Sequence, residues 1–420
     1  MSKINNEAAS RSLLLTASNH AVNRGDDMAK NHSTTPNIIR KTYRYRAYPQ
    51  SQAVWHKLER TLDLCRNLYN CALEERQTAW ERQKCHIPIS YFSQANQLSA
   101  IKQDLPEYQD VGSQVLQDVL RRLDKAFKAF FRRVQNGENP GYPRFKGKNR
   151  YHSFIYPSES GWKLNGNKLK LNKIGTLKLR LHRPIKGQIK TVTILRKAGK
   201  WYVCFSVILP KPEPLPKTGK QVGIDVGLES FATLSDGTKV ENPRWHRQAE
   251  HKLKQTHQKV SKRRKGSKRR AKAVRQLQRA HAKVSNQRRD FHHKLARKLV
   301  QSHDLIAFES LNINDMVRNP YLAKSIADAG WGNFLRLLNY KAEEAGREVI
   351  AVNPQLTSQL CSGCGERVDK GLSQRWHACP HCGLSVHRDH NSAQNILQWG
   401  TTGRGGDLVA GSVEARSPVL

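Results

Sequence analysis

Two spacings of apolar residues alternate along this chain, and each predicts a different kind of secondary structure. Apolar and polar residues alternate from Lys41 to Tyr48, as they do in a β-strand, and Pro49 ends this run. Between residues 51 and 134 the apolar residues instead recur every three or four positions, which favours helices that bury one face. This spacing is made by Val54, Leu58, Leu62, Cys65, Tyr69 and Ala72, and again by Val115, Val119, Leu123, Phe127, Phe130 and Val134.

Period two returns between residues 152 and 209, where Gly166-Asn167 and Ala198-Gly199 have the composition of hairpin turns. This pattern predicts a compact antiparallel β module of several short strands. The helical block interrupts this module if the strand at Lys41–Tyr48 belongs to the same sheet. A basic, turn-rich connector, GENPGYPRFKG, precedes the module at residues 137–147.

A third module follows prolines at alternate positions between residues 210 and 216, which favour a stiff, extended linker. Residues 244–298 hold 21 Lys or Arg against two acids, Glu250 and Asp290, which is a surplus of 19 positive charges (21 − 2). The apolar residues there have roughly helical spacing, so we expect a pair of long basic helices. Such a surplus would repel itself unless an anion lay against it, and a phosphate backbone is the natural partner. A solvated helix face without a partner is the alternative.

The charge of the whole chain points to the same partner. Its 73 Lys and Arg against 34 Asp and Glu give a formal net charge of +39, which indicates a polyanion, nucleic acid first and a membrane surface second. No run of about 18 apolar residues occurs, which excludes a transmembrane helix. With 420 residues, about two to four domains are expected. Residues 1–39 and 401–420 lack a periodic pattern, so we expect a disordered leader and a disordered tail.

Four of the eight cysteines form two C-x-x-C pairs separated by fourteen residues, namely Cys361, Cys364, Cys379 and Cys382. This is the spacing of a four-thiolate zinc ribbon, and Gly365 and Gly383 lie where its tight turns need glycine. All four ligands are sulfur, so the zinc would be structural, with no position left for a substrate. His377 and His381 lie nearby and are expected to be bystanders. The scattered cysteines are expected to be reduced and mostly packed; these are Cys65, Cys71, Cys85 and Cys204.

Three acids lie where an apolar strand or helix does not normally tolerate one. Asp225 interrupts the strand-like run Val222–Gly227, Glu309 ends an apolar run, and Asp389 directly precedes a helical pattern at Ser392–Leu397. Taken singly, each is explained as a capping or ion-paired residue, and Asp389 as a helix N-cap. Taken together on one α/β module, they suggest a carboxylate cluster that holds two divalent ions, Mg²⁺ or Mn²⁺, and hydrolyses a phosphodiester.

Several longer strings resemble one family. GIDVGLESFATLSDG, Ser325–Gly332, NYKAEEAGR, VNPQLTSQLCSGCG and HRDHNSAQNI are similar, in this order, to strings of the transposon-encoded TnpB proteins. These are compact RNA-guided nucleases from which type V CRISPR effectors are thought to descend. The likeness runs from about Lys41 to about Gln398. One departure is His387, because many members have an acid two residues before the last catalytic Asp.

The resemblance implies a multidomain α+β fold. A wedge-like β-barrel would be interrupted by a helical recognition lobe and followed by an RNase H-like (RuvC) α/β nuclease domain with an inserted zinc ribbon. We accordingly expect the wedge-like β module at 40–50 and 139–213, the helical lobe at 51–138, the nuclease domain at 218–400, its basic helices at 244–298 and the zinc ribbon at 355–385.

The resemblance also implies residue roles and partners. The family's catalytic, metal-binding acids fall on Asp225, Glu309 and Asp389, and its zinc ligands on the four grouped cysteines. The partners would be a guide RNA from the transposon end and double-stranded target DNA beside a short motif, in a cytoplasmic, nucleoid-associated, prokaryotic setting with no membrane; monomer and dimer both stay open. Candidate nucleic-acid contacts are Lys262, Arg263, Arg264, Lys268, Arg269, Arg270, Arg288, Arg289, Tyr142, Arg144 and Lys146.

Three functions remain to be separated. The first is an RNA-guided DNA endonuclease, in which base pairing supplies the sequence choice. A non-cleaving RNA-guided DNA-binding protein or an accessory transposition factor would share the basic surface and the zinc ribbon, but it would not need the three acids. A DNA strand-transferase would also use an RNase H-like domain, although the helical lobe and β module upstream favour RNA guiding.

Overall fold

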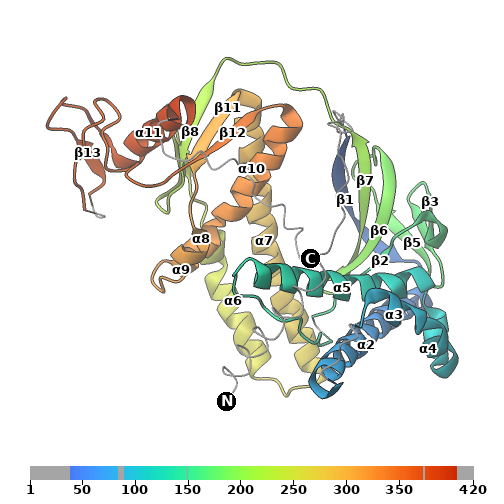
Figure 1. The fold of residues 1–420 in the computed structure, drawn as a ribbon. Helices are drawn as coiled ribbons and strands as arrows, with labels where there is room; N and C mark the ends of the chain where they lie inside the picture. The colour runs from blue at the N-terminus through green and yellow to red at the C-terminus, as the bar shows by residue number, and fades with distance from the viewer. Residues whose placement is uncertain (1–37, 84–88, 149, 372–373, 404–420) are drawn as a thin grey trace. The chain divides into compact units, whose positions relative to one another are not determined.

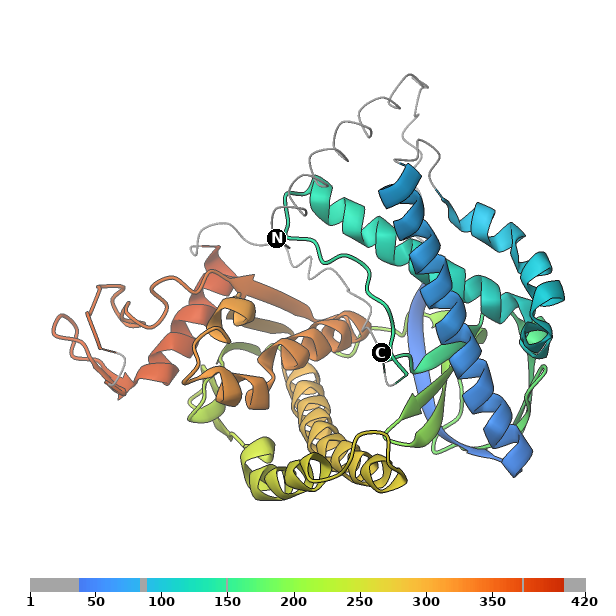
Figure 2. The same ribbon diagram turned by 90° about the horizontal axis from the view of Figure 1, so that it is seen from below.

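The computed structural model describes residues 38–83, 89–148, 150–371 and 374–403, and the chain divides into two compact units with the boundary between Pro210 and Lys211. Figures 1 and 2 show the chain from two directions. Both helices and sheets contribute to each unit, so the fold is multidomain α+β. In the described part of the chain, no helix is both long and apolar enough to cross a membrane.

A strongly curved antiparallel sheet of seven strands forms the centre of the first unit, in the order β2-β6-β7-β1-β5-β4-β3 (Figure 1). The first strand, β1 (Ile38–Pro49), pairs with β7 from Ile38↔Pro210 to Ala47↔Trp201 and with β5 on its other side. The remaining strands are β2 (Ser153–Tyr156), β3 (Trp162–Asn165), β4 (Lys168–Leu171), β5 (Gly175–Arg180), β6 (Gln188–Lys197) and β7 (Lys200–Pro210).

Because β1 pairs with strands that lie beyond residue 150, the helical block interrupts the sheet in sequence, as the alternation at its start suggested. The buried faces of the helices and the inner face of the sheet share one hydrophobic core, in which Tyr45, Leu116 and Trp201 are fully buried. The helices are α2 (Gln52–Gln83), α3 (Tyr91–Asn96), α4 (Leu98–Asp104), the 3₁₀ turn η2 (Pro106–Asp110) and α5 (Ser113–Gln135).

The second unit contains a mixed five-stranded sheet in the order β10-β9-β8-β11-β12. The antiparallel strands β8 (Gln221–Asp225), β9 (Ser230–Leu234) and β10 (Lys239–Glu241) come first in sequence, and β11 (Leu305–Glu309) then lies parallel to both β8 and β12 (Glu348–Val352). The connecting helices are α6 (Trp245–Ser261), α7 (Lys268–Ser302), α8 (Ile313–Met316), α9 (Ala323–Ala329) and α10 (Trp331–Ala345).

Helices cover both faces of this second sheet (Figure 2). On one face, α7 and α10 pack against apolar side chains such as Ile224, Phe231 and Ile306. On the other face lies α11 (Arg388–Thr402), whose Ile396 packs against β11 and β12. A small hairpin, β13 (Trp376–Ala378) and β14 (Ser385–His387), leads directly into α11. The pair of long basic helices expected at 244–298 is present as α6 and α7.

Two predicted boundaries are wrong, both because flanking residues find partners that local pattern does not reveal. The leader was expected to extend to residue 39, but Ile38 and Ile39 belong to β1 and pair with the end of β7. The tail was expected to begin at residue 401, but Thr401 and Thr402 complete the last turn of α11. The rest of both segments, residues 1–37 and 404–420, lies outside the described residues.

Candidate functional site

Two of the three predicted acids lie at the same edge of the second sheet. Asp225 is the last residue of β8 and Glu309 the last residue of β11, and these strands are parallel neighbours. Their register pairs Ile224 with Phe308, so the two acids are the next residues of the two strands. Glu309 is only 9% exposed. The carboxyl ends of adjacent parallel strands therefore carry one carboxylate each.

The third acid, Asp389, reaches this edge because α11 crosses the sheet at very short range. A Cβ on Gly223 of β8 would lie 2.1 Å from the carbonyl oxygen of Ala393, so only glycine allows the helix to pack so closely. A Cβ on Gly227 would likewise lie 3.9 Å from Oδ2 of Asp389. The Asp389 carboxylate therefore lies against the turn that follows Asp225.

The alternative role of Asp389 as a helix N-cap is excluded by the geometry at the start of α11. The N-cap is His387, whose Nδ1 accepts a hydrogen bond from the backbone N–H of Asp389 at 3.2 Å. His387 thus occupies the position at which many members of the family that the sequence resembles have an acid. It caps the helix that carries Asp389. The carboxylate of Asp389, in the first turn, is left for other partners.

Burial and mutual repulsion dominate the electrostatics of the three acids. Burial, and then the charges of Glu309 and Asp389, raise the pKa of Asp225 well above its ordinary value. Burial also raises the pKa of Glu309. The carboxyl oxygens do not form a tight shell: in the described residues, the only group of three or more potential ligands with all atoms within 4.8 Å of one another is the cysteine cluster.

Three polar neighbours of the acids were not predicted as site residues. The hydroxyl of Thr357 donates a hydrogen bond to Oε1 of Glu309, and the side chain of Ser392 hydrogen-bonds Asp225 and lowers its pKa, as does the charge of Arg388. Thr357 lies in VNPQLTSQLCSGCG, and the other two lie in HRDHNSAQNI. Both strings were recognised in the sequence, but nothing in them sets these three residues apart from their other polar members.

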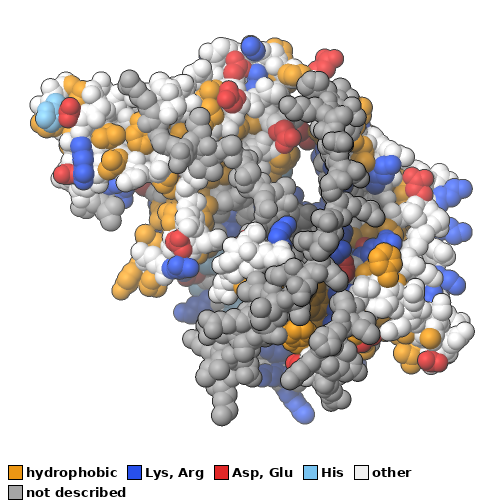
Figure 3. All heavy atoms as spheres, viewed as in Figure 1, with side chains coloured by type: hydrophobic (Ala, Val, Ile, Leu, Met, Phe, Trp, Pro, Cys, Tyr) orange, Lys and Arg blue, Asp and Glu red, His pale blue; other side chains and the backbone are white. Residues whose placement is uncertain are grey.

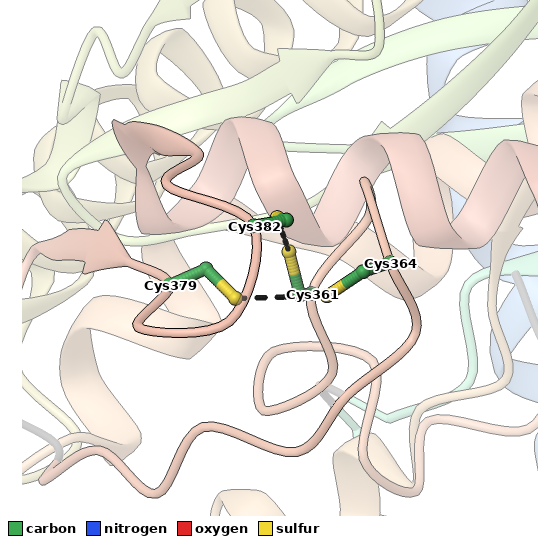
Figure 4. A group of neighbouring side chains, drawn as sticks. All are labelled: Cys361, Cys364, Cys379 and Cys382. Carbon is green, nitrogen blue, oxygen red and sulfur yellow. Dashed lines mark hydrogen bonds between the residues drawn. The ribbon is translucent and has the colours of Figure 1, made fainter.

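The four grouped cysteines meet as the spacing predicts (Figure 4). Their sulfur atoms all lie within 4.8 Å of one another, and the Sγ–Sγ distance is 3.6 Å both for Cys361 with Cys382 and for Cys364 with Cys379. Four sulfurs at about 2.3 Å from one ion would be separated by about 3.8 Å, the edge of a tetrahedron. The cluster is therefore able to hold a zinc ion with thiolates alone.

Two equivalent turns present these cysteines. In one, the N–H of Cys361 donates to the carbonyl of Glu366 and the N–H of Gly365 donates back to the carbonyl of Cys361. The same pair of bonds recurs eighteen residues later (379 − 361) between Cys379, Gly383 and Leu384. Both glycines have a positive φ, 81° and 75°, as the zinc-ribbon prediction required. The imidazole of His377 contacts Lys370 instead, and both predicted bystander histidines stay outside the cluster.

Side chains of α11 attach the first turn to the helix that carries Asp389. The amide of Asn391 accepts from the N–H of Ser362 at 2.9 Å and donates to the carbonyl of Leu360 at 2.7 Å. Asn395 donates to the same carbonyl at 2.8 Å. Both asparagines are buried. The cysteine cluster and the third acid are thus joined through one rigid element.

The predicted nucleic-acid contacts fall into two groups. Lys262, Arg263 and Arg264 are exposed in the turn between α6 and α7, and Lys268, Arg269 and Arg270 follow in the first turn of α7. We call residues 245–284, from the start of α6 to the middle of α7, the basic arm; Figure 3 shows Lys and Arg side chains projecting where the arm turns.

The other predicted contacts are more constrained. Arg288 donates to Asp328 at 2.9 Å, and Arg289 is exposed on α7. Tyr142 packs edge-on against Phe127 and Phe130 after α5, and the Lys146 ammonium lies over the Tyr69 ring. Arg144 is exposed between them. A nucleic-acid role of all these residues stays a prediction.

Family profiles match three stretches of the chain. Residues 204–320 match a profile described as "Probable transposase" and residues 331–396 one described as "Cas12f1-like, TNB domain". Residues 37–85 match a "Helix-turn-helix domain". The described part of that last stretch is instead the strand β1 and one continuous helix of 32 residues, α2.

Two relatives and one solved structure extend over most of the chain. A protein of Streptomyces pristinaespiralis described as "Putative RNA-guided DNA endonuclease" is 34% identical over 373 residues, which is 86% of this chain and 90% of the relative. The Escherichia coli protein InsQ, with the same description, is 31% identical over 362 residues, 82% and 88% of the two chains. A chain of the Cas12f1–sgRNA–target DNA complex has a TM-score of 0.54 at 14% identity, covering 86% of this chain and 99% of that chain, and so has a similar fold.

Proposed function

Because the chain belongs to the TnpB family of transposon-encoded proteins, we propose that it is an RNA-guided DNA endonuclease that hydrolyses DNA phosphodiesters at Asp225, Glu309 and Asp389. The proposal includes a guide RNA from the transposon end and double-stranded target DNA beside a short motif. The names of the relatives support the activity, and the three acids supply its chemistry.

The observation that carries the proposal is the convergence of three carboxylates on a chain of net charge +39. Two lie at the ends of adjacent parallel strands and the third on a helix packed against them. Burial, and then the charges of Glu309 and Asp389, raise the pKa of Asp225. Buried like charges are costly unless cations neutralise them. Their hard oxygen atoms suit Mg²⁺ or Mn²⁺.

In this mechanism, Asp225, Glu309 and Asp389 would hold two divalent ions. The chemistry that such ions would supply there is an activated water and stabilisation of the leaving oxygen of the phosphodiester. The Thr357 hydroxyl orients the Glu309 carboxylate through its hydrogen bond, and Ser392 does the same for Asp225. The positive charge of Arg388 favours the ionised form of Asp225, which is the form that binds a cation.

The remaining parts of the second unit fit this assignment. A mixed sheet with helices on both faces, and acids at the ends of its central strands, supports the RuvC-like domain that the resemblance implies. The cysteine cluster lies in the segment between β12 and α11, before the last acid, which supports a structural zinc ribbon there. The basic arm offers cations to the phosphates of RNA or DNA.

The test is guided cleavage by the purified complex. RNA that co-purifies with the protein is sequenced, and a plasmid that carries the matching target is incubated with the complex and Mg²⁺. We expect Asp225→Ala and Glu309→Ala to abolish cutting and to leave guided DNA binding largely intact. Asp315→Ala is the matched control, because Asp315 is an exposed acid of α8 whose ion-pair partner is the exposed Arg318.

Each alternative has its own outcome. Cutting by the two alanine variants at the wild-type rate would refute the roles given to the acids. A wild-type complex that binds its target without cutting would be the non-cleaving binding protein. Cutting that survives RNase treatment would favour a strand-transferase.

A further inference from the structure

One carboxylate, that of Asp328 in α9, holds the beginning of α6. Its two oxygens accept hydrogen bonds from the backbone N–H of His246 at 2.9 and 3.0 Å, and a longer one comes from the N–H of Arg247 at 3.4 Å. The N-cap of α6 is Arg244, in the left-handed conformation with φ 49°, and its side chain makes no capping bond. The first turn of α6 is thus capped by a residue of another helix.

The same carboxylate also binds α7. Nη2 of Arg288 donates to Oδ1 of Asp328 at 2.9 Å, and the side chains of these two residues are only 23% and 9% exposed. The Nε of Arg288 is buried without a hydrogen-bond partner. Without Asp328, the partly buried guanidinium would lose the acid it pairs with in the described residues.

The C-terminal end of α9 packs closely against α7 at this point. Gly330 has a φ of 68°, and a Cβ there would lie 3.1 Å from Cδ of Arg288 and 3.4 Å from Cε1 of His292. Nε2 of the buried His292 lies 2.9 Å from the carbonyl oxygen of Ala329. Three consecutive residues of α9 and its C-terminus, 328 to 330, therefore contact α7 directly.

The contact between α9 and α7 is important because of where α9 lies in the chain. The helix lies on the segment that leaves β11 at Glu309 and enters the core helix α10 at Trp331. The basic arm, in contrast, buries few residues of its own: Leu253, Ala273 and Val284. The position of the basic arm thus depends on the place where α6 and α7 contact the segment that follows Glu309.

We propose that Asp328 is a positioning residue that fixes the basic arm relative to Glu309, so that nucleic acid held on the arm meets the carboxylate site in one register. This inference rests on the proposed function, because it assumes that the basic arm holds the nucleic-acid strand that is cut, or the duplex that contains this strand. Asp328 itself touches neither substrate nor metal; it acts through α6 and α7.

Three variants separate the two attachments. Asp328→Ala removes both. Asp328→Asn keeps an oxygen for the α6 amides but removes the charge that faces Arg288, and Arg288→Met keeps the cap and removes the ion pair. The matched control is Glu250→Gln, because Glu250 pairs with Lys324 between the same helices α6 and α9 but in an exposed position, with side chains 47% and 57% exposed. Exposed pairs contribute little.

The first measurement is single-turnover cutting by preassembled complexes, with the cut positions mapped. For Asp328→Ala we expect the cutting rate to fall by about 10²-fold, because small misplacements of reacting groups cost that much, and the cuts to spread over neighbouring phosphodiesters. RNA affinity should stay within about threefold, since individual phosphate contacts on the arm remain. Asp328→Asn and Arg288→Met should lie between this variant and the wild type, and Glu250→Gln should match the wild type.

The second measurement does not need cutting. Amide hydrogen exchange at His246 and Arg247 should accelerate by about fivefold in Asp328→Ala, as expected for a lost helix cap, and the protection of bound RNA against nucleases should shift. If Asp328→Ala fails to fold, Asp328→Asn is read in its place.

Two results would overturn the inference. One is wild-type cut positions together with an unchanged rate per bound complex. The other is an unchanged RNA protection pattern despite faster amide exchange, which would make Asp328 a structural cap alone. If the wild type does not cut DNA at all, the proposed function fails, and the RNA protection pattern still decides whether Asp328 positions the arm.

Discussion

The two polar clusters of the second unit are built in opposite ways. The four cysteines bring their sulfur atoms within 4.8 Å of one another on short turns in which most of the described residues are not buried. The three acids lie further apart: Asp225 and Glu309 end strands of a well-packed apolar sheet, and Asp389 lies in the first turn of α11. We expect the sheet to fold without a cation and the turns to need one to hold them. One metal would therefore be part of the fold, and the other part of the reaction.

The two clusters are nevertheless coupled through α11. Asn391 and Asn395 hold the first cysteine turn, and Asp389 lies on the same helix, only two residues before Asn391. A change at the sulfur cluster should therefore reach the acid, while a change at the acids need not reach the sulfur cluster. The following experiments test this asymmetry.

The largest effect should come from removing Mg²⁺. Dialysis against magnesium-free buffer should lower guided cutting by about 10³-fold or more, because the carboxylates alone cannot activate water. The zinc content should stay at about one ion per chain, since four thiolates hold zinc far more tightly than carboxylates hold Mg²⁺. Cutting assays and elemental analysis are made on the same sample, and restored Mg²⁺ is the control. Loss of both metals together would contradict the comparison.

Removing one sulfur ligand should have the next largest effect. In Cys379→Ser we expect zinc to be lost and cutting to fall by about 10–100-fold, the size seen when the support of a site is disturbed. The reason is that β14 and α11 follow this turn directly, so Asp389 loses its support. Cys71→Ser, which changes an exposed free cysteine of the first unit, is the control. Full activity without zinc would break the proposed link through α11.

A third prediction concerns the core that α7 and α10 form against the second sheet. Burial lowers the pKa of His292 to about 4. The imidazole therefore stays neutral in the folded unit until the pH approaches 4, whereas in the unfolded chain it gains a proton as the pH falls through about 6.5. The stability that His292 contributes is therefore complete above about pH 6.5 and is lost as the pH falls towards 4, by about 3 kcal/mol in total.

Urea unfolding at several pH values checks this expectation. His292→Gln should flatten the loss of unfolding free energy between pH 6.5 and 4.5, whereas His251→Gln, at an exposed position of α6, should not. If the unfolding free energy of His292→Gln fell with pH as steeply as that of the wild type, the acid sensitivity would come from the metal clusters and not from the core.

The smallest effect should come from relieving repulsion between the acids. Asp225→Asn removes one buried charge beside Glu309 and Asp389, so the magnesium-free protein should gain about 1–2 kcal/mol of unfolding free energy, as replacements at functional sites often do. Mg²⁺ should then stabilise the wild type more than the variant. Asp236→Asn is the control, because this exposed acid in the turn between β9 and β10 accepts the N–H of Thr238 at 2.8 Å, and no other acid is among the groups that shift its pKa. A destabilised Asp225→Asn protein would contradict the picture of a charge-strained site.

The sequence predicts most of what is local in these clusters. The C-x-x-C spacing fixes which sulfurs can meet, because each pair lies within one turn. The apolar runs before Asp225 and Glu309 likewise reveal two buried strands ending in acids. Their parallel pairing is not visible, because it depends on how the 35-residue helix α7 returns the chain to the sheet.

Contacts between distant segments account for the rest. Thr357 and Ser392 carry no local signal that sets them apart from other polar residues, and only the folded chain brings them to Glu309 and Asp225. The same limit applies to the cations: Arg288 and Arg264 look alike in the sequence, yet the first pairs with Asp328 and the second lies in an exposed turn. Pattern reveals where charge accumulates but not which charges are already paired.

The central place of β1 in the seven-stranded sheet has a consequence for how the chain is made. Its neighbours, β5 and β7, begin at Gly175 and Lys200, so β1 leaves the ribosome about 125 residues before it can form its first ladder. Until then the side chains of Tyr43 and Tyr45 lack the sheet that buries them. Such long-range pairing slows folding and exposes unpaired strand edges to association, so the first unit should be the part of a nascent chain that most needs chaperone protection.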